Sequence, residues 1–373
     1  MTAIPLSVFG QSPTPTRLRE AATALINGDI VLAESDLQEI LKVTPGDTRA
    51  LNLLGMVRAE QHRNDEAERL FLRVIEHDPK MAGAHVNLGL LYAQTSRTAE
   101  AVTQLENALR IEPNRRDAVT ALAGLLRTEA RTVAATNPEE ALSYLVKARK
   151  VAPEDPDVLC DFGMVALRVN LNNDAAEAFR SALANRQDDP AALYGLGRAQ
   201  IGLAKYQDAR ATFEHYLKLK PSDPSARYAM GLALAALQQP EDAKREFESS
   251  IQLQPAQTES YFQLGLLMLE QRQLDSAAED FHHVLERDAR HEGALTGIGR
   301  VEFERKNYSS AEMYFRQAIV ADSEQRQAHY YLGLTLARLG QKEESAKELE
   351  TASRIEHAEL EKQQAATRIE NPR

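Results

Sequence analysis

The sequence has almost nothing with which to build covalent or metal crosslinks. Cys160 is the one cysteine among 373 residues, which excludes an internal disulfide and a thiolate zinc site. Tryptophan is absent, and no apolar run approaches the roughly 18 residues that a membrane-spanning helix needs. We therefore expect no membrane insertion, and a fold that is stabilised by packing of ordinary apolar side chains.

An excess of basic charge is also missing. The chain has 44 lysine and arginine residues against 55 aspartate and glutamate residues, so its net charge is -11. Such a chain repels nucleic-acid phosphates unless its cations gather on one face, and the sequence has no basic stripe. We expect no nucleic-acid partner.

The N-terminal residues 1–13 are rich in proline, serine and threonine, and we expect them to form a flexible lead. Their apolar segment, residues 3–9, is interrupted by Pro5 and has no basic stretch before it, which makes it a poor signal peptide. We therefore expect a cytoplasmic protein. The alternative is an exported or periplasmic protein whose leader is hidden by the choice of start codon.

Three series of residues repeat in one register along the chain, every 34 residues except for one step of 40. The first series is small: Gly55, Gly89, Ala123, Gly163, Gly197, Gly231, Gly265, Gly299 and Gly333. The second is also small: Ala67, Ala101, Ala141, Ala175, Ala209, Ala243, Ala277, Ala311 and Ser345. The third is large and apolar: Phe71, Leu105, Leu145, Phe179, Phe213, Phe247, Phe281, Phe315 and Leu349. Chance does not keep three series in step, so the chain is a repeat array.

Polar turn residues separate the first two series, and a proline ends six of the units. Because proline ends a helix, each unit reads as helix, turn, helix and stop. The small residues mark where two antiparallel helices approach closely, and the large residue fills the space beside that contact. We expect ten units over residues 14–353. Residues 354–373 should form a C-terminal capping helix and tail, in which Ile355 and Leu360 cover the last apolar face.

This pattern resembles the tetratricopeptide repeat, whose period is 34 and whose signature is a Leu-Gly pair, then alanine, a large apolar residue and proline. The resemblance covers almost the whole chain. It departs from the signature where Gln187, Ala289 and Ser323 replace the final proline. The resemblance implies an all-α fold, a right-handed α-solenoid superhelix of stacked helix-turn-helix units. It also implies that the first helices line a concave groove that binds proteins.

One unit carries six extra residues, near 127–140. Residues 127–135 favour helix, so we expect the first helix of this unit to extend by about two turns before Asn137 and Pro138 start the second. The insertion is either a tolerated loop or a specific docking element in which Arg127 and Arg131 lie one turn apart.

Catalytic signatures are absent from the sequence, including phosphate-binding glycine loops, nucleophile elbows and zinc-binding helices. His282, His283 and His291 form the most suggestive cluster, but adjacent histidines on a helix point about 100° apart and cannot chelate together. Cys160 is expected to be a packing residue. We therefore expect no catalytic residue, no metal and no cofactor.

By the resemblance, residues just before and just after each repeated glycine project into the groove. Tyrosine and arginine dominate interface hot spots, so the binding residues that we expect there are aromatic or cationic. They are Tyr194, Arg198, Tyr228, Phe262, Arg300 and Tyr330. The alternative is that some groove residues only seal contacts between neighbouring units.

Two known modes of this family do not fit. The chaperone-tail clamp needs cations on successive first helices, but Asp117 occupies one such place. The asparagine ladder of superhelical glycosyltransferase arrays would need nine asparagines, of which only Asn87 is present.

The sequence therefore predicts a non-enzymatic scaffold or adaptor that binds a protein or peptide partner in complex assembly. A regulatory or targeting subunit of an enzyme such as a transferase is the alternative.

Overall fold

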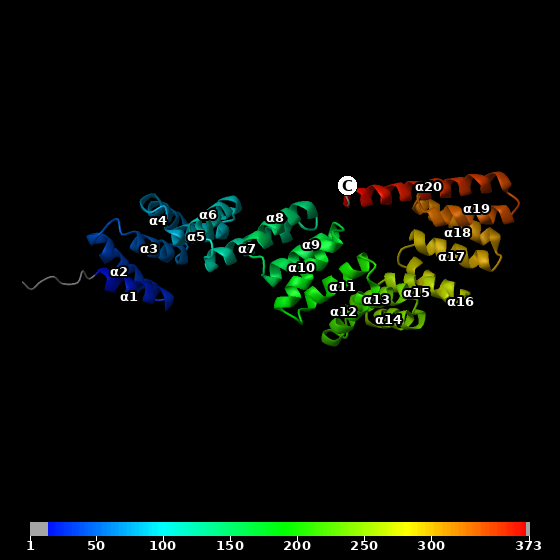
Figure 1. The fold of residues 1–373 in the computed structure, drawn as a ribbon, viewed down its shortest axis with the longest axis horizontal. Coiled ribbons are helices and arrows are strands. Elements are labelled where there is room, and N and C mark those ends of the chain that lie inside the picture. The colour runs from blue at the N-terminus through cyan, green and yellow to red at the C-terminus, as the bar shows by residue number, and fades with distance from the viewer. Residues whose placement is uncertain (1–13, 371–373) are drawn as a thin grey trace, which may run out of the picture. The chain divides into compact units, whose positions relative to one another are not determined.

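A computed structural model describes residues 14–370, and the expected lead over residues 1–13 lies outside this range. The described residues form twenty α-helices and no strand, so the expected all-α helical repeat solenoid is confirmed (Figure 1). None of these twenty helices is both long enough and apolar enough to cross a membrane.

The helices fall into two compact units, Met1–Gln187 and Asp188–Arg373. The N-terminal unit contains α1 (Thr14–Ile26), α2 (Ile30–Val43), α3 (Thr48–Glu60), α4 (Asn64–His77), α5 (Ala82–Gln94), α6 (Thr98–Ile111), α7 (Arg116–Val133), α8 (Pro138–Val151), α9 (Pro156–Arg168) and α10 (Asn172–Asn185). The C-terminal unit contains α11 (Pro190–Gly202), α12 (Tyr206–Leu219), α13 (Pro224–Ala236), α14 (Pro240–Leu253), α15 (Glu259–Glu270), α16 (Leu274–Leu285), α17 (Glu292–Glu304), α18 (Tyr308–Ala321), α19 (Arg326–Arg338) and α20 (Lys342–Glu370). Each odd-numbered first helix pairs with the second helix that follows it.

Within each pair the repeated glycine lies against the large residue of the second helix. A Cβ atom added to Gly231 would come within 2.5 Å of the Phe247 ring, and one added to Gly89 within 2.8 Å of Leu105 Cγ. Real Cβ atoms do not approach so closely, so the two helices can pack at this distance only because the residue is glycine. All members of the alanine series up to Ala311 are fully buried, as are six phenylalanines of the third series. The expected role of the three series is confirmed.

Most turns within a pair contain one residue with a left-handed backbone. It is glycine only at Gly28 and Gly340, where φ is +76° and +82°. The other turns use residues with a side chain at φ between 56° and 66°: His62, Ser96, Asn170, Ala204, Gln238, Arg272 and Lys306. Because L-residues pay a steric penalty in this region, these turns are held by the helix packing on either side.

The insertion lengthens one first helix. α7 has 18 residues, whereas α5 and α9 have 13 each, so the extension is five residues and falls short of the two turns expected. Asn137 caps α8 by accepting a hydrogen bond from the backbone N–H of Glu140, and Pro138 is its first residue, as expected.

At the C-terminal end, the expected boundary at residue 354 falls inside α20, which is one continuous helix from Lys342 to Glu370. Ile355 is buried, as expected for a capping residue, but the expectation for Leu360 is wrong, because 47% of that residue is exposed. Arg326, the first residue of α19, lies 3.7 Å from Glu356 and 3.6 Å from Glu359. Beyond Glu359, α20 therefore extends past the first residue of α19, the helix with which it pairs.

Candidate functional site

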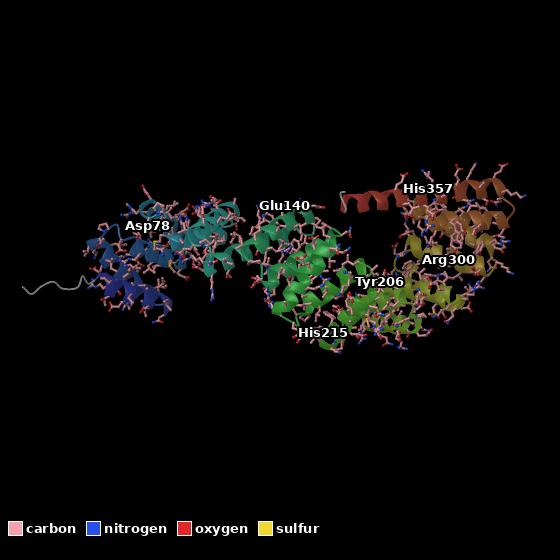
Figure 2. All side chains as sticks on the ribbon, in the orientation of Figure 1. Asp78, Glu140, Tyr206, His215, Arg300 and His357 are labelled. Atoms are coloured by element: carbon pink, nitrogen blue, oxygen red, sulfur yellow. The ribbon has the colours of Figure 1, made fainter. Side chains whose placement is uncertain are left out.

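All six expected binding residues lie on first helices of the C-terminal unit. Neighbouring first helices contact one another from α11 through α13, α15 and α17 to α19, and equivalent repeat positions therefore share one face. We call this surface the first-helix face. It carries Tyr194 and Arg198 on α11, Tyr228 on α13, Phe262 on α15, Arg300 on α17, labelled in Figure 2, and Tyr330 on α19.

Two of the tyrosines are half-buried against the second helix of their own pair. The centroid of the Tyr194 ring lies 6.0 Å from that of Phe213 and 5.6 Å from that of Tyr216, and the Tyr228 ring lies 6.0 Å from Phe247. Burial raises the pKa of both Tyr194 and Tyr228 and so favours the neutral form of their hydroxyls. They can donate and accept hydrogen bonds at the surface while their rings stabilise the pair.

Phe262 lies at the joint between two repeats. Its ring centroid is 6.1 Å from Phe281 on α16 and 5.1 Å from His291, the residue that caps α17. A Cβ atom on Gly293 would come within 2.8 Å of the Phe262 ring. Phe262 therefore seals neighbouring units, which is the alternative role that the sequence left open.

The two expected arginines lie over aromatic rings. The Arg198 guanidinium carbon is 6.0 Å from the centroid of Tyr194, and that of Arg300 is 5.1 Å from the centroid of Tyr331. Arg198 is exposed and Arg300 half-buried. Neither makes an ion pair with a carboxylate in the described part of the chain. A cation–π contact orients each guanidinium while its N–H donors remain available to a ligand.

Tyr330 is the most exposed of the four aromatic residues, at 45%, and its ring meets the edge of Tyr331 at 5.3 Å. Tyr331 in turn stacks on Phe315 at 5.9 Å and meets Phe303 at 6.1 Å. The sequence reasoning did not assign Tyr331 to the site. A signal was present, because four preceding repeats of the C-terminal unit have Gly195, Ala229, Gln263 and Gly297 at its position.

The insertion does not present free arginines. Arg127 Nε lies 2.7 Å from Asp161 Oδ2 and its Nη1 lies 3.3 Å from Asp157 Oδ2, while Arg131 Nη2 lies 2.9 Å from Asp161 Oδ1. The extended end of α7 is thus tied to α9 by charge-assisted hydrogen bonds. These contacts give Arg127 and Arg131 a bracing role within the N-terminal unit.

The residues considered for chemistry are dispersed. His282 is exposed, His283 packs against Tyr261 with ring centroids 4.9 Å apart, and His291 accepts a hydrogen bond from the backbone N–H of Ala294. Cys160 is buried. Within the described residues, no group of three or more histidine, cysteine or acidic side chains is placed to hold a metal ion.

The side chains at the positions considered for the chaperone-tail clamp and the asparagine ladder make contacts within the chain. Asn87 Nδ2 donates to Asn52 Oδ1 over 3.0 Å, between α5 and α3. Asp117 accepts from Arg115 Nε at 2.8 Å. These side chains stabilise the N-terminal unit and match neither a cationic clamp nor an asparagine ladder.

Comparison with solved structures finds several repeat proteins. The crystal structure of YrrB, described as a TPR protein with an unusual peptide-binding site, is 26% identical over 49% of this chain and 95% of that chain, with a TM-score of 0.41. MamA from Desulfovibrio magneticus RS-1 is 25% identical over 45% of this chain and 96% of that chain, with a TM-score of 0.42. A chain of the APC/C hetero-tetramer Cut9-Hcn1 is 12% identical over 92% of this chain and 87% of that chain, with a TM-score of 0.49.

No curated protein matches the chain significantly. Since all three TM-scores are below 0.5, the assignment of the chain to a family rests on a sequence match instead. The family model for the tetratricopeptide repeat matches residues 52–117, 160–224, 228–290, 262–325 and 296–357, which together cover well over half of the sequence. The chain belongs to the tetratricopeptide repeat family.

Proposed function

We propose that this chain is a non-enzymatic adaptor that binds a segment of a partner protein on the first-helix face of its C-terminal unit and so helps to assemble a complex. Tetratricopeptide repeats generally act as scaffolds for protein–protein interactions, and the peptide-binding site described for YrrB is consistent with such a role. The observation that carries the proposal is the pair of arginines that lie over aromatic rings, Arg198 and Arg300, on one face with exposed Tyr330.

The partner segment should contact the exposed side chains directly and the half-buried rings only at their edges. Tyrosine and arginine supply large contact areas and several hydrogen bonds, which is why they dominate protein interfaces. Tyr194, Tyr228 and Phe262 are therefore assigned two roles, packing within the array and forming the floor of the binding surface.

The test uses the exposed residues, because truncating Tyr228 or Phe262 would also remove packing against Phe247 or Phe281. Cells expressing the full chain are crosslinked, and the crosslinked proteins are identified by mass spectrometry. The double variant Arg198→Ala/Tyr330→Ala should lose the partner crosslinks of the wild type while its circular dichroism is unchanged.

The control variant is Arg180→Ala, which removes an exposed arginine from the second helix α10. It should keep all partner crosslinks. If the double variant keeps them as well, the binding surface lies elsewhere on the chain. If the captured partner is an enzyme, such as a transferase, whose turnover changes on binding, the chain is a regulatory or targeting subunit of that enzyme, and the adaptor role is refuted.

A further inference from the structure

One row of the first-helix face has a cation at each end and apolar residues between. It consists of the residue that directly follows the repeated glycine on α11, α13, α15 and α17: Arg198, Leu232, Leu266 and Arg300. We call it the arginine–leucine row. The two leucines are half-buried and lie between the two arginines, since the four first helices contact one another in order.

The charge of this row is not matched by an acidic side chain in the part of the chain that the structure describes. The chain has a net charge of -11, yet neither Arg198 nor Arg300 makes an ion pair with an acidic side chain in residues 14–361. Arg127, on a first helix of the N-terminal unit, instead pairs with Asp161 at 2.7 Å. A cation left without an internal carboxylate on an acidic protein is complementary to an acidic ligand.

The equivalent row in the N-terminal unit carries no charge. It consists of Met56, Leu90, Gly124 and Met164. The pattern of arginine, two leucines and arginine is therefore not a requirement of repeat packing, because the same helical position is filled by apolar or small residues where the repeats stack in the same way.

We propose that the arginine–leucine row binds an extended partner segment that has an acidic side chain at each end of a short apolar stretch. The proposal rests on the function proposed above and names the chemistry of the partner. The end carboxylates pair with the two guanidiniums, and the apolar stretch covers Leu232 and Leu266. Burial and the negative charge of Glu259 on α15 raise the pKa of Tyr228 on α13, and this negative charge disfavours an acidic residue in the part of the segment that crosses these two central helices.

Helix spacing sets the length of the segment. Packed helix axes are about 8–10 Å apart, so three steps from α11 to α17 span roughly 24–30 Å. An extended chain advances about 3.3 Å per residue, so the two acidic side chains should be separated by roughly eight residues.

A display library of random 16-residue peptides, selected on the full-length chain, tests the proposal. The enriched peptides should carry aspartate or glutamate at two places about eight residues apart, with apolar residues between them. Their affinity should fall at least about tenfold for the variant Arg198→Glu/Arg300→Glu and stay within about twofold for Arg180→Glu on α10. Selection on the double variant should enrich lysine or arginine at the same two places.

The outcomes separate this proposal from the one on which it rests. In one outcome, the enriched peptides lack the acidic pair but bind the variant Leu266→Ser more weakly than the wild type. The first-helix face would then remain the binding surface, and the arginine–leucine row would be refuted as a charge-matched site. Peptides that bind the wild type and are insensitive to all three variants would refute both proposals. Circular dichroism and urea unfolding of each variant show whether a loss of binding reflects a loss of folding.

Discussion

Replacing Gly231 with alanine should destabilise the C-terminal unit, although alanine is the better helix former. The new Cβ would lie 2.5 Å from Phe247 Cε1 and 2.7 Å from its Cδ1. Carbon atoms in contact prefer about 3.5–4.0 Å, so the ring or the helix must move by about 1 Å. Phe247 is 1% exposed and packs against Tyr228, which leaves the ring little room.

Two terms of opposite sign decide the magnitude. Forcing an extra methyl group into a packed core costs about 1–3 kcal/mol, and replacing a helical glycine with alanine returns about 1 kcal/mol. The clash is with a rigid ring at the first-to-second helix contact, so the upper part of the first range applies. We expect a net loss of about 2 kcal/mol in the free energy of unfolding.

Urea unfolding followed by circular dichroism measures this loss. The matched control is Gly124→Ala on α7, where an added Cβ has no atom within 4 Å. That variant should be more stable by about 0.5–1 kcal/mol, because only the helix propensity changes. Equal stabilisation by the two substitutions would refute the close-approach explanation of the repeated glycine.

A second variant tests the same contact by replacing the ring with a smaller side chain. The unit with the insertion has Ala123 in place of the glycine and Leu145 in place of the phenylalanine, and both are buried. The double variant Gly231→Ala/Phe247→Leu should therefore recover about half of the lost stability. No recovery would show that the ring is not the source of the clash.

Three further changes should each have a measurable effect on urea unfolding. Burial raises the pKa of Asp280 to about 7, above its value in the unfolded chain, so the free energy of unfolding falls as the pH rises toward 7. Asp280→Asn should therefore stabilise the chain by about 1 kcal/mol at pH 8, after solvent screening, and by less at pH 4. Ala204→Gly should raise the free energy of unfolding by about 1 kcal/mol, because φ is 56° at this residue and glycine adopts that backbone conformation without a steric penalty. A lower stability of the variant would show that the turn is not strained. Asp161→Asn should cost about 1–2 kcal/mol by leaving Arg127 and Arg131 without their shared carboxylate, and an unchanged unfolding midpoint would remove the bracing role of α7.

The array could be predicted from the sequence because its signals are local. The contact between Gly231 and Phe247 recurs with the 34-residue period, so spacing alone indicates which residues meet. The cap of α8 by Asn137 was predictable for the same reason, since capping depends on a few neighbouring residues.

The site could be predicted only in part, because burial depends on how one repeat stacks on the next. Sequence position placed Phe262 on the first-helix face but did not show that His291 and Gly293 would enclose it. Likewise, Arg131 reads as a free cation until α9 brings Asp161 beside it. Contacts between repeats join residues about 30 positions apart whose pairing no periodic pattern specifies.

The most direct test of the binding surface compares two leucines on consecutive helices of the C-terminal unit. Leu266 lies on the first-helix face, on α15, whereas Leu253 is 42% exposed at the end of the second helix α14. Each is replaced in turn by the photocrosslinking residue p-benzoylphenylalanine in the full-length chain, and the cells are irradiated. A partner crosslinked from position 266 and not from position 253 is the predicted result; a partner crosslinked only from position 253 would contradict the account.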